Sequence, residues 1–121
     1  MKPRILLHGE QILLNQMFLE MLKKIALVIP MKSVENIQEI FSKQSIDLLV
    51  FESMETWEQD LKLLQVLKRN YPNLIIILID GGESPENVIR CFKMGIDDYF
   101  KKPVDTVLLT ERIEALLKSK I

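Results

Sequence analysis

A run of six consecutive apolar residues, Leu74–Ile79, most strongly limits the folds open to this chain, because four of the six are isoleucine. Apolar runs this rich in β-branched residues are typical of a strand in the middle of a parallel sheet, where helices cover both faces. Successive parallel strands need a crossover connection, which is usually a helix. The run therefore predicts that helical segments separate the other apolar stretches of the chain.

Short apolar runs and helical spacings do alternate along the sequence. The runs predict five strands, at Ile5–Gly9, Ala26–Met31, Asp47–Phe51, Leu74–Ile79 and Asp98–Lys101. Apolar residues three or four positions apart predict five helices, at Gln11–Ile25, Val34–Lys43, Thr56–Asn70, Ser84–Met94 and Asp105–Lys118. This alternation favours an α/β fold with a doubly wound, five-stranded parallel sheet in the flavodoxin-like order 2-1-3-4-5. Residues 1–121 are expected to form a single domain, since no linker or repeat interrupts the pattern.

The composition excludes several classes of protein. A formal net charge of −1 provides no attraction to nucleic acid or to an anionic membrane, so neither is an expected partner. Cys91 is the single cysteine, which excludes an internal disulfide and fits a reducing cytoplasm. The first apolar stretch is too short for a signal peptide or a membrane span. We therefore expect a cytoplasmic protein.

Charged residues stand where four of the predicted strands end. Glu10, Glu52 and Asp80 follow the first, third and fourth strands, and Lys102 follows the fifth. The carboxyl ends of parallel strands meet at one edge of an open α/β sheet, where ligands bind. In the predicted strand order, Glu10 and Glu52 lie side by side, with Asp80 next to them and Lys102 approaching from the edge. The sequence predicts a functional site, or the remains of one, at this edge.

The stretches SIDLLVFE, YPNLIIILID and MGIDDYFKKPVD resemble the receiver domain of two-component response regulators, and the resemblance covers the whole chain. The most specific part is GIDDYF followed by KKP, which is similar to the signature of the fifth receiver strand. The resemblance implies that Lys102 contacts a phosphoryl group, that a cis bond precedes Pro103, and that Tyr99 is an aromatic switch. It also implies protein partners: a histidine kinase, and an output domain or a second copy that docks on helix 84–94, strand 98–101 and helix 105–118.

The sequence departs from receivers where the chemistry takes place. Gly9 and Glu10 stand where receivers carry two acids that hold Mg²⁺, Glu52 replaces the acceptor aspartate, and Asp80 replaces a serine or threonine. A glutamate carboxylate lies about 1.5 Å further out, and in-line transfer tolerates such a displacement badly. Asp80 places an anion before an incoming phosphoryl group, and the loss of an acid at Gly9 weakens Mg²⁺ binding.

We therefore expect a degenerate receiver that is not an enzyme and acts as a phosphorylation-independent interaction module. No cofactor is expected, although three carboxylates against one lysine leave Mg²⁺ on Glu10 and Glu52 as an alternative. The preferred arrangement has Lys102 bridging Glu52 and Asp80 without metal. The alternative function is a working receiver in a Mg²⁺-dependent phosphorelay with atypical site residues.

Several residues allow two interpretations. Tyr99 is either a switch or an edge-strand aromatic whose hydroxyl meets Asp80. His8 is interpreted as a partly buried histidine with a hydrogen-bond partner, and Trp57 as a partner anchor or a lid beside the site. The first helix carries apolar residues beyond its core stripe, which mark either an interface or a surface covered by other helices: Ile12, Leu13, Met17 and Leu19.

Overall fold

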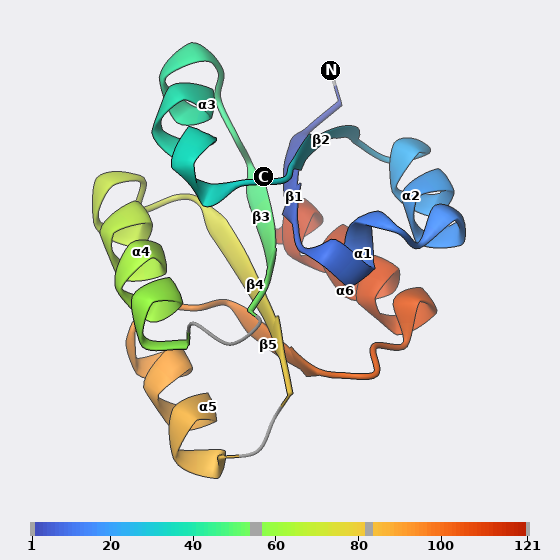
Figure 1. Ribbon diagram of the computed structural model, residues 1–121. Helices are drawn as coiled ribbons and strands as arrows, with labels where there is room; N and C mark the ends of the chain where they lie inside the picture. Colours follow the sequence, from blue (N-terminus) through green and yellow to red (C-terminus); the bar gives the residue numbers. More distant parts are fainter. Residues whose placement is uncertain (1, 54–56, 82–83, 121) are drawn as a thin grey trace.

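Five parallel strands form one sheet, and helices cover both of its faces (Figure 1). The computed structural model describes residues 2–53, 57–81 and 84–120. The strands pair in the order β2-β1-β3-β4-β5 and comprise β1 (Arg4–His8), β2 (Leu27–Met31), β3 (Leu48–Glu52), β4 (Ile75–Asp80) and β5 (Asp98–Lys101). The flavodoxin-like α/β fold predicted from the sequence is therefore confirmed.

The helices lie in two layers. α3, α4 and α5 cover one face of the sheet, and α1, α2 and α6 cover the other (Figure 1). They comprise α1 (Glu10–Leu13), α2 (Gln16–Lys23), α3 (Ile37–Lys43), α4 (Trp57–Asn70), α5 (Pro85–Lys93) and α6 (Thr106–Ser119), with a 3₁₀ turn at Val34–Asn36. The predicted helix start at Thr56 lies outside the described residues. In the described parts of the chain, no helix combines the length and apolarity needed to cross a membrane.

Residues 11–25 form two helices, so the prediction of one helix there is wrong. The Asn15 side chain accepts a hydrogen bond from the N–H of Phe18 at 2.9 Å and caps α2. Asparagine favours this position because its amide oxygen satisfies a backbone donor that has no partner at a helix start. The described chain therefore has six helices instead of five. At the break, the side chains of Leu14 and Met17 are 75% and 68% exposed.

The strands send alternate side chains into two separate cores. On β4, Ile76 and Leu78 pack with residues of α3, α4 and α5, whereas Ile77 and Ile79 pack with residues of α1, α2 and α6. This burial on both faces is the physical reason for the isoleucine-rich run. A shift of one residue would exchange the two sets, so the packing fixes the register of β4. That register determines which side chains reach the carboxyl edge of the sheet.

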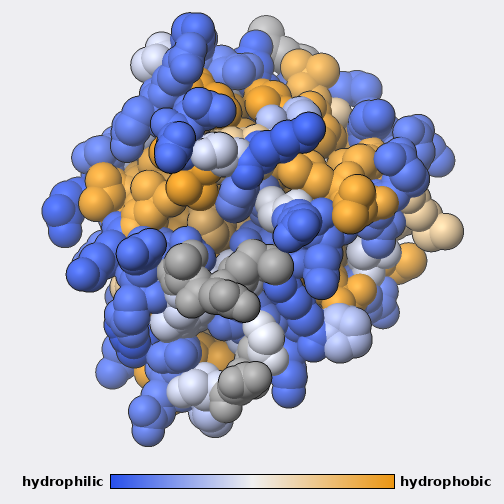
Figure 2. All heavy atoms as spheres, viewed as in Figure 1, coloured by the Kyte–Doolittle hydropathy of each residue, from blue (hydrophilic) through white to orange (hydrophobic). Residues whose placement is uncertain are grey.

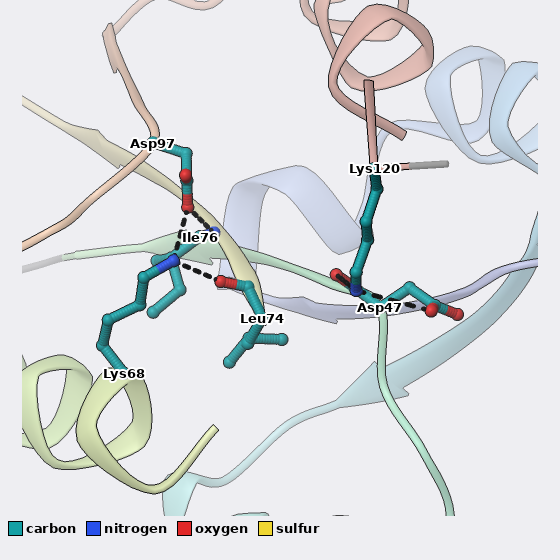
Figure 3. Close-up of polar contacts among 6 residues, drawn as sticks. All are labelled: Asp47, Lys68, Leu74, Ile76, Asp97 and Lys120. Carbon is teal, nitrogen blue, oxygen red and sulfur yellow. Dashed lines mark hydrogen bonds and ion pairs between the residues drawn. The ribbon is translucent and has the colours of Figure 1, made fainter. Parts of the chain in front are cut away.

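An ion pair between Lys68 and Asp97 lies at the opposite, amino edge of the sheet (Figure 3). The ammonium of Lys68, on α4, donates to the carbonyl oxygen of Leu74 at 2.6 Å and pairs with Asp97 Oδ2 at 3.1 Å. Asp97 Oδ2 also accepts a hydrogen bond from the N–H of Ile76 at 2.8 Å. These contacts join α4 to the beginnings of β4 and β5.

Candidate functional site

Three neighbouring strands bring Glu52, Asp80 and Lys102 to the carboxyl edge of the sheet. Glu52 is the last residue of β3 and Asp80 the last of β4, so both belong to the strands that they were predicted to follow. Lys102 follows β5, and its backbone N–H donates to the carbonyl oxygen of Asp80 at 2.8 Å. The Lys102–Pro103 peptide bond is cis. The structure therefore brings together three of the four charged residues predicted for this site.

The Glu52 side chain is buried, and both of its carboxylate oxygens are bound. Oε1 accepts hydrogen bonds from the backbone N–H groups of Gln11 at 3.0 Å and Ile12 at 3.1 Å. Oε2 pairs with the ammonium of Lys102 at 3.0 Å, so this half of the predicted lysine bridge is present. Only 3% of the Glu52 side chain is exposed. A carboxylate buried this deeply is tolerable because charged and polar donors compensate it.

Gly9 lies directly against Glu52. The φ angle of Gly9 is 144°, in a region that L side chains rarely adopt. A Cβ atom at this position would lie 2.3 Å from both Cβ and Oε1 of Glu52. Because one of these atoms is the Cβ of Glu52, a shorter side chain at position 52 would not remove the overlap. The inward position of Glu52 therefore requires glycine at position 9, and the backbone conformation of Gly9 favours glycine independently of Glu52.

Tyr99 meets Asp80 on the neighbouring strand. Its hydroxyl donates a hydrogen bond to Asp80 Oδ1. Burial, followed by this hydrogen bond and the nearby carboxylate charge, raises the pKa of Tyr99 above its usual range. The hydroxyl is therefore protonated at neutral pH and stays a donor to Asp80. The contact between Tyr99 and Asp80 is the second of the two predicted interpretations, and the switch role stays a prediction.

Glu10 is exposed and does not line the small pocket of about 140 Å³ beside Glu52. Helix α1 begins at Glu10, and its backbone N–H groups face Glu52 where the sequence predicts the Glu10 carboxylate. The lining residues are Gln11, Ile12, Asn15, Glu52, Ile79, Lys102, Pro103, Val104 and Thr106. Glu10 is therefore an exposed residue that directly precedes the Gln11 N–H donor of the site, and a role for its carboxylate stays a prediction.

A buried Ser53–Asp60 pair next to the site was not predicted from the sequence. Ser53 Oγ donates to Asp60 Oδ2 at 2.7 Å, and both residues are buried. The carbonyl oxygen of Ser53 also accepts a hydrogen bond from the ammonium of Lys102 at 3.3 Å. Aspartate is common near the start of a helix, because it can accept hydrogen bonds from free N–H groups there and interacts favourably with the helix dipole. No signal in the sequence therefore distinguishes Asp60 from an ordinary helix-start residue.

His8 and Trp57, which the sequence analysis singled out, have different surroundings in the structure. Nδ1–H of His8 donates to the carbonyl oxygen of Met31 at 2.7 Å, and its ring lies 4.8 Å from that of Phe51. The prediction of a partly buried histidine with a partner is therefore confirmed. Trp57 begins α4 and packs against the core under that helix. Its indole N–H is buried and has no hydrogen-bond partner among the described residues.

The described carboxylates do not fit the Mg²⁺ ion that the resemblance to receivers implies. Mg²⁺ requires well-placed oxygen ligands in near-octahedral geometry. Both oxygens of Glu52 are bound by N–H and ammonium donors, Glu10 is exposed, and Gly9 has no room for a second acid. Nowhere in residues 2–53, 57–81 and 84–120 do three acidic, histidine or cysteine side chains gather closely enough to bind a metal.

Comparison with known proteins finds sequence similarity between this chain and bacterial regulatory proteins. No protein-family model matches the chain. The transcriptional regulatory protein RprY of Bacteroides fragilis is 35% identical over 78 residues, which are 64% of this chain and 33% of that protein. The heme response regulator HssR of Staphylococcus haemolyticus is 31% identical over 77 residues, which are 64% of this chain and 34% of that protein. The chain thus spans about a third of the length of these curated relatives.

The solved structures show the same fold at lower identity. A response regulator from Thermotoga maritima has a TM-score of 0.83 at 22% identity, and the match covers 98% of this chain and 99% of that one. The fold of this solved structure is thus the fold of the present chain, and the proteins with similar sequences are also regulators by name.

Proposed function

We propose that this chain, which is a response-regulator receiver domain, regulates a partner protein by docking to it without accepting a phosphoryl group. The observation that carries this proposal is the Glu52 carboxylate, which is buried and bound by Lys102 and by two backbone N–H groups. A side chain of this kind keeps an anion in the site permanently. The state of the domain then does not depend on a kinase.

The contacts of Glu52 oppose phosphoryl acceptance. An acceptor carboxylate must present one oxygen in line with the incoming phosphorus. Both oxygens of Glu52 are bound, and 3% of the side chain is exposed, so attack would first require the loss of these bonds. Asp80 adds a second carboxylate at the same edge, and like charges at close range repel an incoming phosphoryl dianion. Two separate features therefore support an inactive acceptor.

The contact between Tyr99 and Asp80 supports a docking surface in one constant state. Asp80 accepts the Tyr99 hydrogen bond, so a phosphoryl group is not needed to hold the tyrosine at this position. On the helices that flank β5, Ile89 and Phe92 of α5 and Leu108 of α6 are about half exposed. Exposed apolar side chains on neighbouring elements favour a protein partner. A second copy fits this surface, since a two-fold axis would pair it with itself.

Helices α1 and α2 carry a second candidate surface, which is one of the two interpretations that the sequence allows. Of the four residues named for it, Met17 is exposed, whereas Ile12 is buried and Leu13 and Leu19 pack against the core. Figure 2 shows apolar side chains on the side of the molecule where these helices lie. Leu14 and Met17 at the break between the helices are the most exposed large apolar side chains among the described residues, at 75% and 68%. The exposed side chains of Ile89, Phe92 and Leu108 mark the first candidate surface, the α5–β5–α6 surface. If self-association covers that surface, a histidine kinase or another partner would use the α1–α2 surface.

One solved structure provides a parallel for a receiver of this kind. It belongs to an atypical orphan response regulator with a phosphorylation-independent regulatory mechanism. Its TM-score is 0.78 at 21% identity, and the match covers 95% of each chain. This likeness is one of fold, and the proposal for the present chain depends on its own site residues.

The first test is treatment of the protein with acetyl phosphate and excess Mg²⁺, followed by intact mass and amide NMR spectra. We expect no phosphoryl adduct and no shifts near Glu52, Lys102 or Tyr99. A labile adduct would favour the alternative, a working receiver in a Mg²⁺-dependent phosphorelay. A receiver domain with the usual acid pair and acceptor aspartate serves as the positive control for the reagent.

The variant Glu52→Asp sharpens this test. It restores the residue type of the acceptor but leaves Gly9 and Asp80 in place. We expect no phosphoryl adduct in this variant, because the second metal-binding acid is still absent and the second anion is still present. Robust labelling of Glu52→Asp would show that the acceptor residue alone determines activity.

Sedimentation equilibrium tests the docking surfaces. If the α5–β5–α6 surface forms a dimer, Phe92→Glu should shift the protein to monomer, because a buried unpaired charge opposes association. Met17→Glu should leave the dimer intact. Val66→Glu on α4, where the side chain is 40% exposed, provides a matched control. A dimer that resists Phe92→Glu and dissociates with Met17→Glu would reverse the assignment of the two surfaces.

A further inference from the structure

A second and larger pocket lies at the amino edge of the sheet, at the opposite ends of the strands from Glu52 and Lys102. Its volume is about 790 Å³, which is within the range of small-molecule sites. It opens between the first residues of the chain, the segment after α2 and the last turns of α6. Lys2, Pro3, Arg4, Ile25, Leu117 and Lys118 are among the residues that line it.

The pocket is positively charged although the chain as a whole carries a net charge of −1. Four cationic side chains and two carboxylates line it, which leaves a formal excess of two positive charges. One of the two carboxylates, Asp47, is already bound: it accepts a hydrogen bond from the N–H of Arg4 at 2.8 Å. The ammonium of Lys120 also lies 3.5 Å from Asp47 Oδ1 (Figure 3). The pocket therefore has more positive charge than its own acids can pair.

Arg4 is the central residue of this argument. It is the first residue of β1, and its side chain is partly buried. Its guanidinium makes no hydrogen bond or ion pair with any part of the chain that the structure describes. A guanidinium at the wall of a pocket favours an oxyanion that accepts two parallel hydrogen bonds from its planar donors. Lys118, on the last turn of α6, offers a second cation at the same pocket.

The pocket also has apolar walls beside its charged side chains. Pro3, Ile25 and Leu117 line the same pocket as Arg4 and come from three different segments. A bare inorganic ion would leave these surfaces in contact with water, whereas a ligand with an apolar body would cover them. The combination of an unpaired guanidinium with apolar walls distinguishes this pocket from a simple patch of surface lysines.

We infer that this pocket binds a small molecule that carries a phosphate or carboxylate group on an apolar body, with Arg4 as the anchor for the oxyanion. The pocket lies apart from the site of Glu52 and Lys102, so the inference does not depend on the proposed mode of signalling. The chain would then have a small-molecule binding site at the amino edge of the sheet, in addition to the two proposed docking surfaces at α5–β5–α6 and α1–α2.

The test is an NMR titration of the intact chain with phenyl phosphate, benzoate, inorganic phosphate and phenol as separate probes. We expect saturable shifts around Arg4, Ile25 and Leu117 with one or both aromatic anions, and the tighter of the two identifies the oxyanion. Inorganic phosphate and phenol should each bind more weakly, because each lacks one half of the recognised chemistry. If inorganic phosphate binds as tightly as the aromatic anions, the pocket is a general anion site and the inference is wrong.

Variants at Arg4 separate the site from non-specific attraction. Arg4→Gln should weaken binding at least about tenfold, because the glutamine amide can replace one of the two hydrogen bonds of the guanidinium at most and carries no charge. Arg4→Lys keeps the charge but not the planar arrangement of donors, so its affinity should lie between those of the wild type and Arg4→Gln. The matched control is Arg69→Gln, an exposed arginine on α4, on the other face of the sheet. Equal weakening by Arg4→Gln and Arg69→Gln, with folding confirmed by thermal melts, would overturn the inference.

Discussion

Two lysine–carboxylate pairs lie at opposite edges of the sheet and differ in depth. Lys102 pairs with Glu52 at 3.0 Å at the carboxyl edge, and Lys68 pairs with Asp97 at 3.1 Å at the amino edge. Both lysine side chains are 22% exposed, but Glu52 is 3% exposed and Asp97 is 30% exposed. The chemistry is the same, so the burial of the carboxylate is the main difference between the two pairs.

The difference in depth separates two uses of an ion pair. At the amino edge, Asp97 remains in contact with water and ties backbone groups of β4 to α4. At the carboxyl edge, where an open α/β sheet usually binds its ligand, Glu52 is withdrawn from water and holds the Lys102 ammonium and two backbone N–H groups. Loss of one partner should cost more at the buried pair, because it leaves the other charge buried and uncompensated.

The largest expected effect is that of Glu52→Ala, which should lower the free energy of unfolding by about 3–5 kcal/mol. This change leaves the Lys102 ammonium and two backbone N–H groups without their common acceptor. Urea denaturation measures the loss. Glu111→Ala, an exposed glutamate on α6, should stay within about 0.5 kcal/mol of the wild type. A loss of under about 1 kcal/mol for Glu52→Ala would show that burial does not distinguish the two pairs.

Gly9→Ala should lower the free energy of unfolding by about 2–4 kcal/mol, since it combines an unfavourable backbone conformation with overlap at Glu52. Gly81→Ala is the matched control, because no atom lies within 4 Å of its added Cβ. The loss for Gly9→Ala should persist in a Glu52→Asp background, where the Cβ at position 52 remains. Full recovery in the double variant would mean that only the end of the Glu52 side chain limits position 9.

Asp97→Ala tests the shallower pair and should lower the free energy of unfolding by about 1–3 kcal/mol. The loss comes mainly from the N–H of Ile76, which would no longer have its acceptor. Asp97→Asn retains an acceptor oxygen and should lose less, as measured by the same denaturation curves. The comparison fails if Asp97→Ala is as damaging as Glu52→Ala.

Tyr99→Phe removes one hydrogen bond to Asp80 and should lower the free energy of unfolding by about 1 kcal/mol at neutral pH. The pKa of Tyr99 is raised in the folded state. The contribution of the Tyr99 hydroxyl to the free energy of unfolding is therefore complete below the usual tyrosine pKa of about 10, and it is lost as the pH rises from that value toward the folded one. Stability curves measured between about pH 8 and about pH 11 should therefore converge for the two proteins. A constant difference across this interval would exclude the titration of Tyr99 as the cause.

The smallest effect is expected for the exposed ion pair between Arg90 and Glu58, whose bond is 2.8 Å long. The hydrogen bond from Arg90 lowers the pKa of Glu58, so the contribution exists above the usual glutamate pKa and disappears as the pH falls through the folded value. Arg90→Gln should leave the denaturation midpoint at neutral pH and high salt unchanged within error. A clear loss would show that this surface contact forms part of a larger network.

The periodicity of the sequence was sufficient to predict the fold and the neighbourhood of most site residues. Alternating strand and helix patterns predict a parallel sheet, and the strand order then places Glu52, Asp80 and Lys102 at one edge. The helix break at Asn15 also had a signal, since asparagine favours helix starts, but the apolar spacing across 11–25 concealed it. These predictions depend on local patterns, which are present in the chain before it folds.

The directions of the side chains at that edge depend on tertiary contacts, which no local pattern predicts. Glu52 turns toward Gly9 and the N–H groups of Gln11 and Ile12, whereas Glu10 is exposed. These contacts join residues about forty positions apart, so they depend on how β1 and β3 pack and on the space left by a missing Cβ. Local patterns in the sequence thus account for the sheet and for the charges at its edge. Packing between distant segments buries one of those charges, Glu52, and supplies its partners.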